Sequence, residues 1–358
     1  MSAKTALVAM SGGVDSSVAA ALMAEEGWRT VGVTLKIMPG SPSGFGCCGS
    51  PADIDDAKRV CESLGLAHYT LNMADLFEDK VIKPFIEAYL NQRTPNPCVE
   101  CNKSVKFGHL MALARAWGAD CLATGHYAKT SGGRLFMAED REKDQSYFLY
   151  ALEGDDLAKT RFPLGDMSKS AVRAKARKLK LKTADKPESQ EICFVPGRDY
   201  RKFIAGRVGE SAAALAPGPI KNMQGRTLGR HRGLASYTRG QRRGLGISTA
   251  APSYVVRLEP DSNTLVVGGK QDILSTAFTV RGVRWISGRA PTNKDVRVRI
   301  RHRHAPAPAV LDPFSPQETR VRFLAAQPAV TPGQAAVFYS EEDDEVLGGG
   351  TIAEVDTP

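Results

Sequence analysis

The sequence has no uninterrupted apolar stretch near the roughly 18 to 20 residues that a membrane-spanning helix needs. The apolar run closest to the amino terminus covers only residues 6–10, which is too short for the core of a secretory signal. We therefore expect a soluble, cytoplasmic protein with no membrane partner.

The 358 residues contain only 7 cysteines, a small and odd number. This count does not suit a disulfide scaffold and favours reduced thiols with a catalytic or metal-binding role. Cys98 and Cys101 form a Cys-x-x-Cys pair, but there is no second pair and no His-x-x-x-His partner, so a structural zinc site is not expected. Cys61 and Cys121 lie in apolar patterns and are expected in the core.

Acidic residues are fewer than basic ones, and they are missing altogether between residues 211 and 258. The formal net charge is +9, which favours a polyanionic partner such as nucleic acid. Residues 169–182 contain seven basic and no acidic side chains, and residues 221–257 contain eight basic ones. Phosphate binding would explain both clusters, although a solvated helix surface explains the first one equally well.

A stripe of arginines follows in the carboxyl-terminal third of the chain. Arg297, Arg299, Arg301 and Arg303 recur at every second residue, with Val296, Val298 and Ile300 between them. In a strand, alternate residues share one face, so we expect a cationic ridge on one face and an apolar surface on the other.

Short apolar runs alternate with helical patterns up to about residue 200, which predicts βαβ units, a parallel sheet and the α/β fold class. Beyond that point the Ala-rich sequence gives way to Pro217, Gly218 and Pro219 and then to short alternating runs separated by turn residues. A domain boundary near residue 200 and small β domains after it are therefore expected.

Residues 11–17 (SGGVDSS) follow a predicted strand and open a predicted helix. Two glycines let the backbone turn tightly, and the N–H groups and positive dipole end of the helix attract phosphate. A strand-to-helix turn capped by Asp15 or Ser16 is the simpler alternative. No lysine stands where a Walker loop requires one, so the γ-phosphate chemistry of kinases and GTPases is not supported.

Two segments present cysteines outside apolar patterns. Residues 93–102 (RTPNPCVECN) carry two prolines and place Cys101 just before a helix that is expected to begin near Ser104, where a thiol tends toward thiolate. Residues 188–194 (ESQEICF) place Cys193 on a loop that is expected to run into a short apolar strand.

These motifs together resemble the tRNA-specific 2-thiouridylase (MnmA) family, whose phosphate loop is the PP-loop of ATP pyrophosphatases. The resemblance covers nearly the whole chain. It also includes residues 123–127 (ATGHY), 143–147 (KDQSY), 237–246 (YTRGQRRGLG), 332–339 (PGQAAVFY) and 347–350 (LGGG).

The resemblance implies ATP-dependent thiolation at carbon 2 of the wobble uridine in tRNAs that read Lys, Glu and Gln codons. ATP with Mg²⁺ would be cleaved between its α- and β-phosphates to adenylate the base oxygen. Cys193 would carry a persulfide delivered by a sulfur-relay protein, and Cys101 would act as the nucleophile that frees this sulfur. The expected domains are a PP-loop ATP-binding catalytic domain (residues 1–204), a small central mainly-β tRNA-binding domain (205–275) and a carboxyl-terminal β-barrel-like tRNA-binding domain (276–358).

The family's binding residues carry over to two sets of positions. The expected ATP contacts are Ala9, Met10, Ser11, Gly12, Gly13, Val14, Asp15, Ser16, Leu35 and Gly125. The expected tRNA contacts are Asn96, Pro97, Cys98, His126, Lys143, Asp144, Gln145, Arg301, His302 and Gln334. His126 could instead be a local capping residue at the end of a strand.

One departure from the family leaves the sulfur chemistry open. Position 98 is Cys where some members have Asp with an acid/base role, so that role cannot be carried over. Cys98, Cys101 and Cys193 could alternatively hold an iron–sulfur cluster with one open iron site for sulfide. Cys47 and Cys48 lie on a Gly/Pro/Ser-rich loop that could fold over the site, although a mobile loop is the simpler interpretation.

Two other classes of protein compete with this reading. A PP-loop synthetase that adenylates a small molecule would not need Cys101 or Cys193. A basic RNA-binding module that merely holds ATP would not turn ATP over when tRNA is added.

Overall fold

The computed structural model describes residues 3–37, 49–188, 192–195, 197, 199–209 and 212–356. Its amino-terminal part is built on a five-stranded sheet in the order β3-β2-β1-β4-β7, in which every pairing is parallel. The strands are β1 (Thr5–Ala9), β2 (Arg29–Lys36), β3 (Ala67–Asn72), β4 (Cys121–Thr124) and β7 (Thr160–Arg161).

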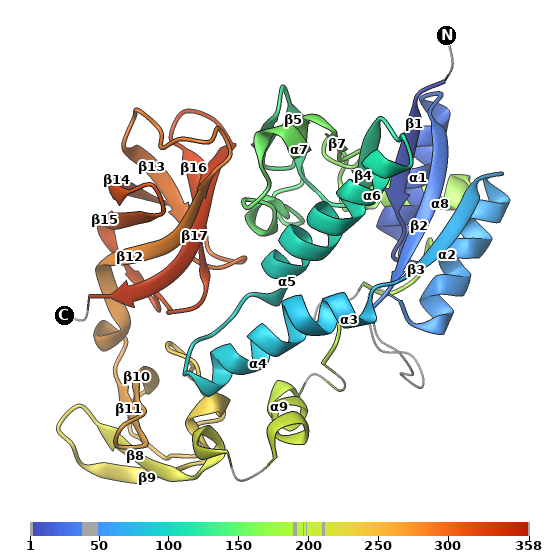
Figure 1. Ribbon diagram of the computed structural model, residues 1–358. Coiled ribbons are helices and arrows are strands. Elements are labelled where there is room, and N and C mark those ends of the chain that lie inside the picture. Colours follow the sequence, from blue (N-terminus) through green and yellow to red (C-terminus); the bar gives the residue numbers. More distant parts are fainter. Residues whose placement is uncertain are drawn as a thin grey trace.

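Helices cover both faces of this sheet (Figure 1). Side chains of β1 alternate between them: Ala6 and Val8 pack into one apolar cluster, and Leu7 packs into another. The first cluster is closed by α1 (Val14–Glu25), α2 (Pro51–Ser63) and α8 (Lys169–Lys178). The second is closed by α3 (Ala74–Phe77), η1 (Glu78–Ile82), α4 (Lys83–Leu90), α5 (Pro97–Glu100), η2 (Cys101–Leu110) and α6 (Met111–Ala116). Burial on both faces explains the continuous apolar runs of the sequence.

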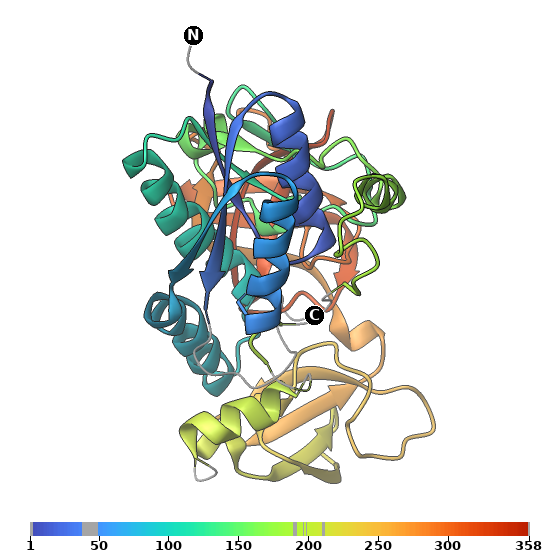
Figure 2. The ribbon, with the colours of Figure 1, turned by 90° about the vertical axis from the view of Figure 1, so that its right-hand side faces the viewer.

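A four-stranded sheet follows, in the order β10-β11-β8-β9. Its strands are β8 (Gly218–Asn222), β9 (Thr227–His231), β10 (Tyr254–Glu259) and β11 (Thr264–Gly268). Together with α9 (Tyr200–Val208) it forms a separate lobe at the bottom of Figures 1 and 2. Short helices η5 (Ala213–Leu215), η6 (Leu234–Ser236) and η7 (Gln271–Ile273) connect these elements.

The carboxyl-terminal part is a closed barrel of six antiparallel strands, because β12 pairs with both β15 and β17. The strands are β12 (Leu274–Trp285), β13 (Asp295–Arg299), β14 (Ala307–Ser315), β15 (Glu318–Pro328), β16 (Ala335–Ser340) and β17 (Glu345–Val355). A hairpin of β5 (Lys129–Ser131) and β6 (Arg134–Phe136) leaves the amino-terminal part and pairs with β17. Two short helices, η3 (Ser146–Phe148) and α7 (Gly154–Ala158), lie next to this junction in the chain.

This architecture confirms the expected fold class, namely an α/β parallel-sheet domain followed by a small β domain and a β-barrel. The boundaries at residues 204/205 and 275/276 stay predictions. Within the described ranges, none of the helices combines the length and the apolar character that crossing a membrane would require.

Candidate functional site

The phosphate loop lies where β1 ends and α1 begins, as its sequence predicts. Gly12 has a φ of +72°, and a Cβ at this position would stand 2.3 Å from the carbonyl oxygen of Asp53, so only glycine fits the turn. The hydroxyl of Ser16 donates to the carbonyl of Gly13 over 3.1 Å and accepts the N–H of Ser11 over 3.1 Å. The turn is thus held by its own serines.

The strand order reverses beside β1, because β2 lies on one side and β4 on the other. In open parallel sheets, ligands bind in the crevice at such a reversal. Ala9 is in register with Val33 of β2 and Thr124 of β4, so Leu35 and Gly125 follow at the same edge of the sheet. A Cβ on Gly125 would stand 2.7 Å from the amide nitrogen of Ser16, so this glycine lets β4 approach the loop closely.

A cluster of charged groups surrounds Asp15 in the phosphate loop. Lys169 Nζ lies 2.7 and 2.8 Å from the two carboxylate oxygens of Asp15, and the Tyr127 hydroxyl donates to one of them over 2.8 Å. On the other side of the turn, Lys186 Nζ donates to the carbonyl of Gly12 over 2.9 Å and to Asp53 over 2.7 Å. The loop lacks a lysine of its own, but the fold brings two to it.

The basic stretch at residues 169–182 is therefore not simply a surface for RNA phosphates. Lys169 pairs with the phosphate loop, Lys175 pairs with Glu25 over 2.6 Å, and Arg177 pairs with Asp185 over 2.7 Å. These acidic partners are distant in sequence or lie outside the stretch, so composition alone could not reveal them. Sequence reasoning missed Lys169, Lys186 and Tyr127 as neighbours of the loop for the same reason.

The helix that carries Cys101 begins earlier than expected. Its first residue is Pro97, and the side chain of Asn96 accepts the N–H of Val99 over 3.4 Å, so Asn96 caps the helix. The expected start near Ser104 is therefore wrong, and Cys101 stands one turn inside the helix, where η2 begins. Cys98 is exposed in the first turn, and Cys101 is half-buried.

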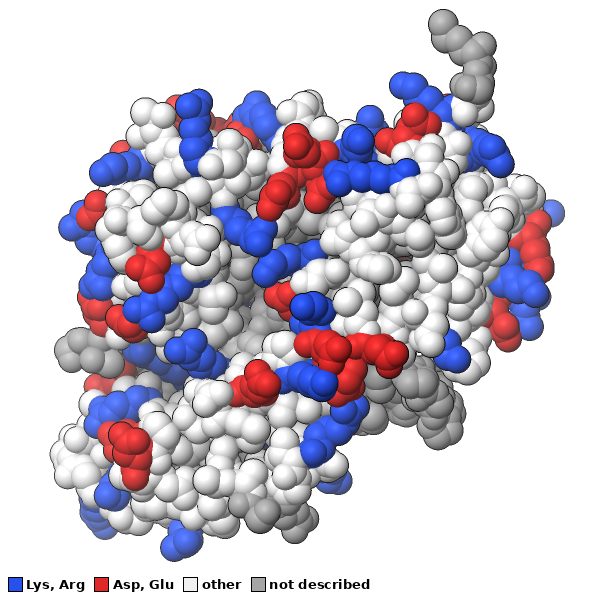
Figure 3. Space-filling view, viewed as in Figure 1, with Lys and Arg blue, Asp and Glu red and all other residues white. Residues whose placement is uncertain are grey.

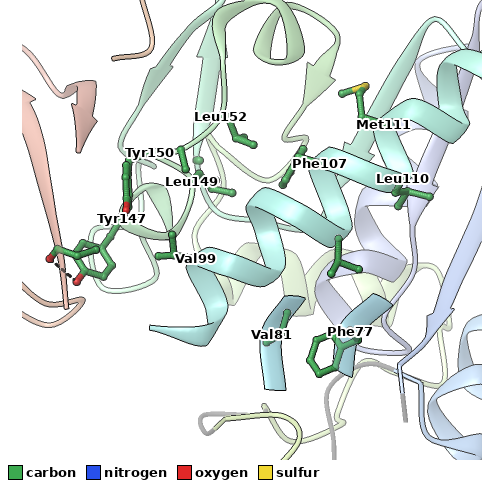
Figure 4. Close-up of a cluster of buried hydrophobic side chains, with 14 of the residues drawn as sticks. Phe77, Val81, Val99, Phe107, Leu110, Met111, Tyr147, Leu149, Tyr150 and Leu152 are labelled. Atoms are coloured by element: carbon green, nitrogen blue, oxygen red, sulfur yellow. Dashed lines mark hydrogen bonds between the residues drawn. The ribbon is translucent and has the colours of Figure 1, made fainter. Parts of the chain in front are cut away.

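Cys193 lies in a turn rather than ahead of the expected strand. The next residue, Phe194, is buried among the rings of Phe77, Phe85 and Phe203, with ring centroids 5.6, 5.1 and 5.5 Å away. Cys193 and Cys101 both pack against one apolar cluster, part of which Figure 4 shows around Phe77, Val81 and Val99. The structure thus anchors both cysteine segments on the same core.

The described part of the chain contains no group of three or more His, Cys, Asp or Glu side chains placed to hold a metal ion. The iron–sulfur alternative with Cys98, Cys101 and Cys193 as ligands stays a prediction. Cys61 and Cys121 are buried as expected, and burial raises the pKa of each thiol to about 11. Cys47 and Cys48 lie outside the described residues.

The loop at residues 143–145 is fixed from several sides. Lys143 Nζ lies 2.7 Å from Glu188, and Gln145 accepts the N–H of Tyr127 over 3.0 Å. Asp144 differs from the expectation of a tRNA contact, because it is 1% exposed and pairs with Arg299 over 2.7 Å. Through this ion pair, Asp144 holds the loop at residues 143–145 against the barrel.

The barrel also holds the loop that precedes Cys98. Gln334 donates to the carbonyls of Thr94 and Pro95 over 3.0 and 3.3 Å, and Thr94 N–H donates to Pro332 over 3.0 Å. His302 Nε2 donates to the carbonyl of Asp144 over 3.1 Å. Gln334 and His302 of the barrel are therefore bonded to two loops of the amino-terminal domain.

The arginine stripe alternates as predicted only within β13, which ends at Arg299, whereas Arg301 and Arg303 lie in the turn that follows. The stripe is not an open cationic ridge. Val296 and Val298 face the barrel core. On the other face of β13, Arg299 is buried against Asp144 and Arg297 donates to the carbonyl of Ser340 over 3.0 Å. In the turn, Arg301 donates to the carbonyl of Pro328 over 3.1 Å. A loop of the amino-terminal domain and neighbouring parts of the barrel contact these arginines, which the sequence analysis expected to be exposed to solvent.

His126 follows β4, half-buried between the rings of Phe107 and Phe162, each 6.1 Å away. Its Nδ1 is 2.8 Å from the hydroxyl of Thr124, so the local hydrogen bond expected of a strand-end histidine is present. Burial, together with the positive charge of Lys106, lowers the pKa of His126 well below its usual range. The imidazole is thus neutral at neutral pH.

A hollow separates the barrel from the amino-terminal domain, and Lys and Arg side chains gather along it (Figure 3). Figure 1 places α5 between the two bodies. A positively charged hollow beside a nucleotide loop suits a polyanionic ligand.

Removing one partner of the Asp144–Arg299 pair is expected to destabilise the barrel. Asp144→Ala leaves the Arg299 guanidinium buried without its anion, which costs about 3–5 kcal/mol in such pairs. The measurement is urea unfolding followed by circular dichroism. Asp343→Ala serves as the control, because its pair with Arg134 is exposed and worth at most about 1 kcal/mol. Equal stability of the two variants would contradict the inference.

The lowered pKa of His126 predicts a loss of stability in acid. Its folded-state pKa lies below the unfolded value near 6.5, so the unfolded chain binds more protons as the pH falls through that value, and folding is weakened. The urea midpoint should drop between pH 7.5 and 5.5. His126→Gln should make this drop smaller, whereas replacement of the exposed His109 by glutamine should leave it unchanged. An identical drop in all three proteins would refute the assignment.

Comparison with known proteins gives consistent matches over the whole chain. Three family models match in succession: "tRNA methyl transferase HUP domain" at residues 4–197, "tRNA methyl transferase PRC-barrel domain" at 201–269 and "Aminomethyltransferase beta-barrel domain" at 275–352.

Two similar curated proteins carry the name tRNA-specific 2-thiouridylase MnmA. The protein from Moorella thermoacetica is 47% identical over 360 residues, covering 98% of this chain and 99% of its own. The protein from Carboxydothermus hydrogenoformans is 46% identical over 361 residues, covering 98% of this chain and 97% of its own. Among solved structures, a complex of a 4-thiouridine synthetase with RNA and bound ATP is 17% identical, with a TM-score of 0.38 over 58% of this chain and 51% of that one.

Proposed function

This chain belongs to the tRNA-specific 2-thiouridylase family, and from that premise we propose how it thiolates tRNA. It is an ATP-dependent tRNA sulfurtransferase. The proposed target is carbon 2 of the wobble uridine in tRNAs that read Lys, Glu and Gln codons. The descriptions of two matching family models name a tRNA methyl transferase. A phosphate loop and two cysteine segments that pack on one core are instead suited to adenylation and sulfur transfer.

One observation carries the proposal, namely a chain of ion pairs that links the phosphate loop to the expected base-binding loop. Lys169 bridges Asp15 to Glu188 over 2.7 and 3.0 Å, and Glu188 continues to Lys143 over 2.7 Å. Glu188 stands five residues before Cys193 in the sequence. ATP, base and sulfur carrier would therefore meet around one network.

In the proposed first step, the uridine O2 attacks the α-phosphate of ATP. Pyrophosphate leaves, and the base oxygen becomes part of a good leaving group, AMP. The N–H groups of the loop and the start of α1 would hold the phosphates, with Ala9, Met10, Ser11, Gly12, Gly13, Val14, Asp15, Ser16, Leu35 and Gly125 as the proposed ATP contacts. Asp15 would be the carboxylate available to Mg²⁺ at the loop.

In the proposed second step, a sulfur-relay protein has loaded Cys193 as a persulfide. The Cys101 thiolate attacks the Sγ of Cys193, the Sγ–S bond breaks, and a Cys101–Cys193 disulfide forms. The released hydrosulfide replaces AMP at carbon 2. The proposed contacts with tRNA are Asn96, Pro97, Cys98, His126, Lys143, Gln145, Arg301, His302 and Gln334, and Asp144 is now proposed to position the loop between Lys143 and Gln145.

The test begins with protein purified without oxygen, whose iron and sulfide are measured before activity. Iron-free protein that thiolates tRNA from a Cys193 persulfide, and releases pyrophosphate only when tRNA is present, would support the proposal. Activity that rises with about four irons per chain would instead establish the iron–sulfur alternative. Pyrophosphate release without tRNA would favour a small-molecule synthetase, and no release at all would favour a module that only holds ATP.

A further inference from the structure

Cys98 has no step in the proposed reaction, yet its position differs from that of every other described cysteine. It is exposed in the first turn of α5, whereas Cys61 and Cys121 are buried and Cys101 and Cys193 are half-buried. Cys98 and Cys101 are three residues apart in one continuous helical run, so they lie on the same side, one turn apart. That spacing brings Cβ atoms to roughly 5–6 Å, within the reach of a disulfide after a small adjustment.

The start of this helix is held in place from outside. Asn96 caps it, Pro97 fixes its first residue, and the preceding loop is bonded to the barrel through Thr94 and Gln334. A thiol fixed one turn from its target reacts at a high effective concentration. Cys98 also lies at the positive end of the helix dipole, which favours a negatively charged sulfur.

We propose that Cys98 is the resolving thiol of this enzyme, an inference that rests on the persulfide route of the proposed function. After sulfur transfer, the Cys98 thiolate attacks the Sγ of Cys101 in the Cys101–Cys193 disulfide. A Cys98–Cys101 disulfide forms, and Cys193 leaves as a thiolate that can accept new sulfur. The exchange conserves electrons, because one disulfide replaces another.

The enzyme then needs two electrons and two protons from an external reductant, which we assign to a dithiol protein. Cys101 and Cys193 pack against an apolar cluster, where a protein reductant has poor access. Exposed Cys98 moves the disulfide to a place that such a reductant can reach. The exchange also releases Cys193, the proposed persulfide carrier, before the external reductant acts.

The test compares wild type with Cys98→Ser after one turnover with persulfide-loaded enzyme, ATP and tRNA. Samples are alkylated, and disulfides are mapped by peptide mass spectrometry. Wild type should contain Cys98–Cys101, and the variant should accumulate Cys101–Cys193. With a thioredoxin-type dithiol protein as reductant, the rate of later turnovers relative to the first should fall at least about tenfold in the variant. Dithiothreitol should restore that ratio.

Cys61→Ala, in the buried core, is the matched control and should keep the wild-type ratio. Two results together would overturn the resolving role and leave the persulfide route standing. Wild type would keep the Cys101–Cys193 disulfide, and Cys98→Ser would leave the ratio of later turnovers to the first unchanged. Loss of bound iron in Cys98→Ser would overturn the resolving role in favour of a cluster ligand. Thiolation by wild type without any disulfide would refute the persulfide route on which it rests.

Discussion

Cys101→Ser is expected to lower the rate of tRNA thiolation by at least about a thousandfold, and Cys193→Ser is expected to do the same. A hydroxyl can neither carry a persulfide sulfur nor attack one at neutral pH. The two losses should not add in the double variant, because both thiols serve one step of the proposed mechanism. Thiolated nucleoside released from the tRNA by nuclease digestion is measured by mass spectrometry.

ATP chemistry should survive in both variants, because the phosphate loop is built from backbone groups and serines that these changes leave in place. Pyrophosphate release in a single turnover with tRNA should therefore stay within about threefold of wild type. Cys61→Ala, also a change of one thiol but inside the core, should leave thiolation intact. Full thiolation by either serine variant would end the proposed mechanism.

Lys169→Met is expected to lower tRNA-dependent pyrophosphate release by about a hundredfold, in the range found when a group that stabilises developing charge is removed. The departing pyrophosphate gains negative charge, and the loop has no lysine of its own. Lys169 Nζ already lies 2.7 Å from Asp15 at the start of α1. Asp15→Ala should also lose adenylation, because it removes a loop carboxylate and releases Lys169.

Lys175→Met provides the control, because it removes the same charge from the same helix at a site that pairs with Glu25. Its pyrophosphate release should stay within about threefold of wild type. Tyr127→Phe removes one hydrogen bond to Asp15 and should cost about fivefold. Equal losses in Lys169→Met and Lys175→Met would indicate a general effect of charge on tRNA binding rather than a role at the loop.

The local sequence was sufficient to predict those parts of the site that are formed by one strand and the helix after it. The glycines and serines of residues 11–17 adopt the predicted strand–turn–helix, since their conformation depends on neighbours in sequence. The alternation of Val296 and Val298 likewise predicted which face of β13 enters the barrel core. Asn96 and Pro97 also match the signals of a helix start, which the expected start near Ser104 overlooked.

Long-range contacts account for what sequence reasoning missed. Lys169 meets Asp15 across 154 positions, and Arg299 meets Asp144 across 155. Nothing in a polar loop such as residues 143–145 distinguishes a solvated aspartate from one whose partner arrives with a later domain. The burial of Arg299 depends on the same docking, so it could not be inferred from alternation alone.

The contacts of the barrel with the catalytic loops have a consequence for how the enzyme is made on the ribosome. Thr94 bonds to Pro332, Gln334 holds Thr94 and Pro95, and β6 pairs with β17 at Val346 and Glu345. The nucleotide sheet can form while the chain is still growing, because all its strands end by Arg161. The loop at residues 94–95 and the β5–β6 hairpin can reach their final positions only after the last barrel strands have emerged. A nascent chain would thus acquire its nucleotide site well before it could modify RNA, which places completion of the site among the latest events of folding.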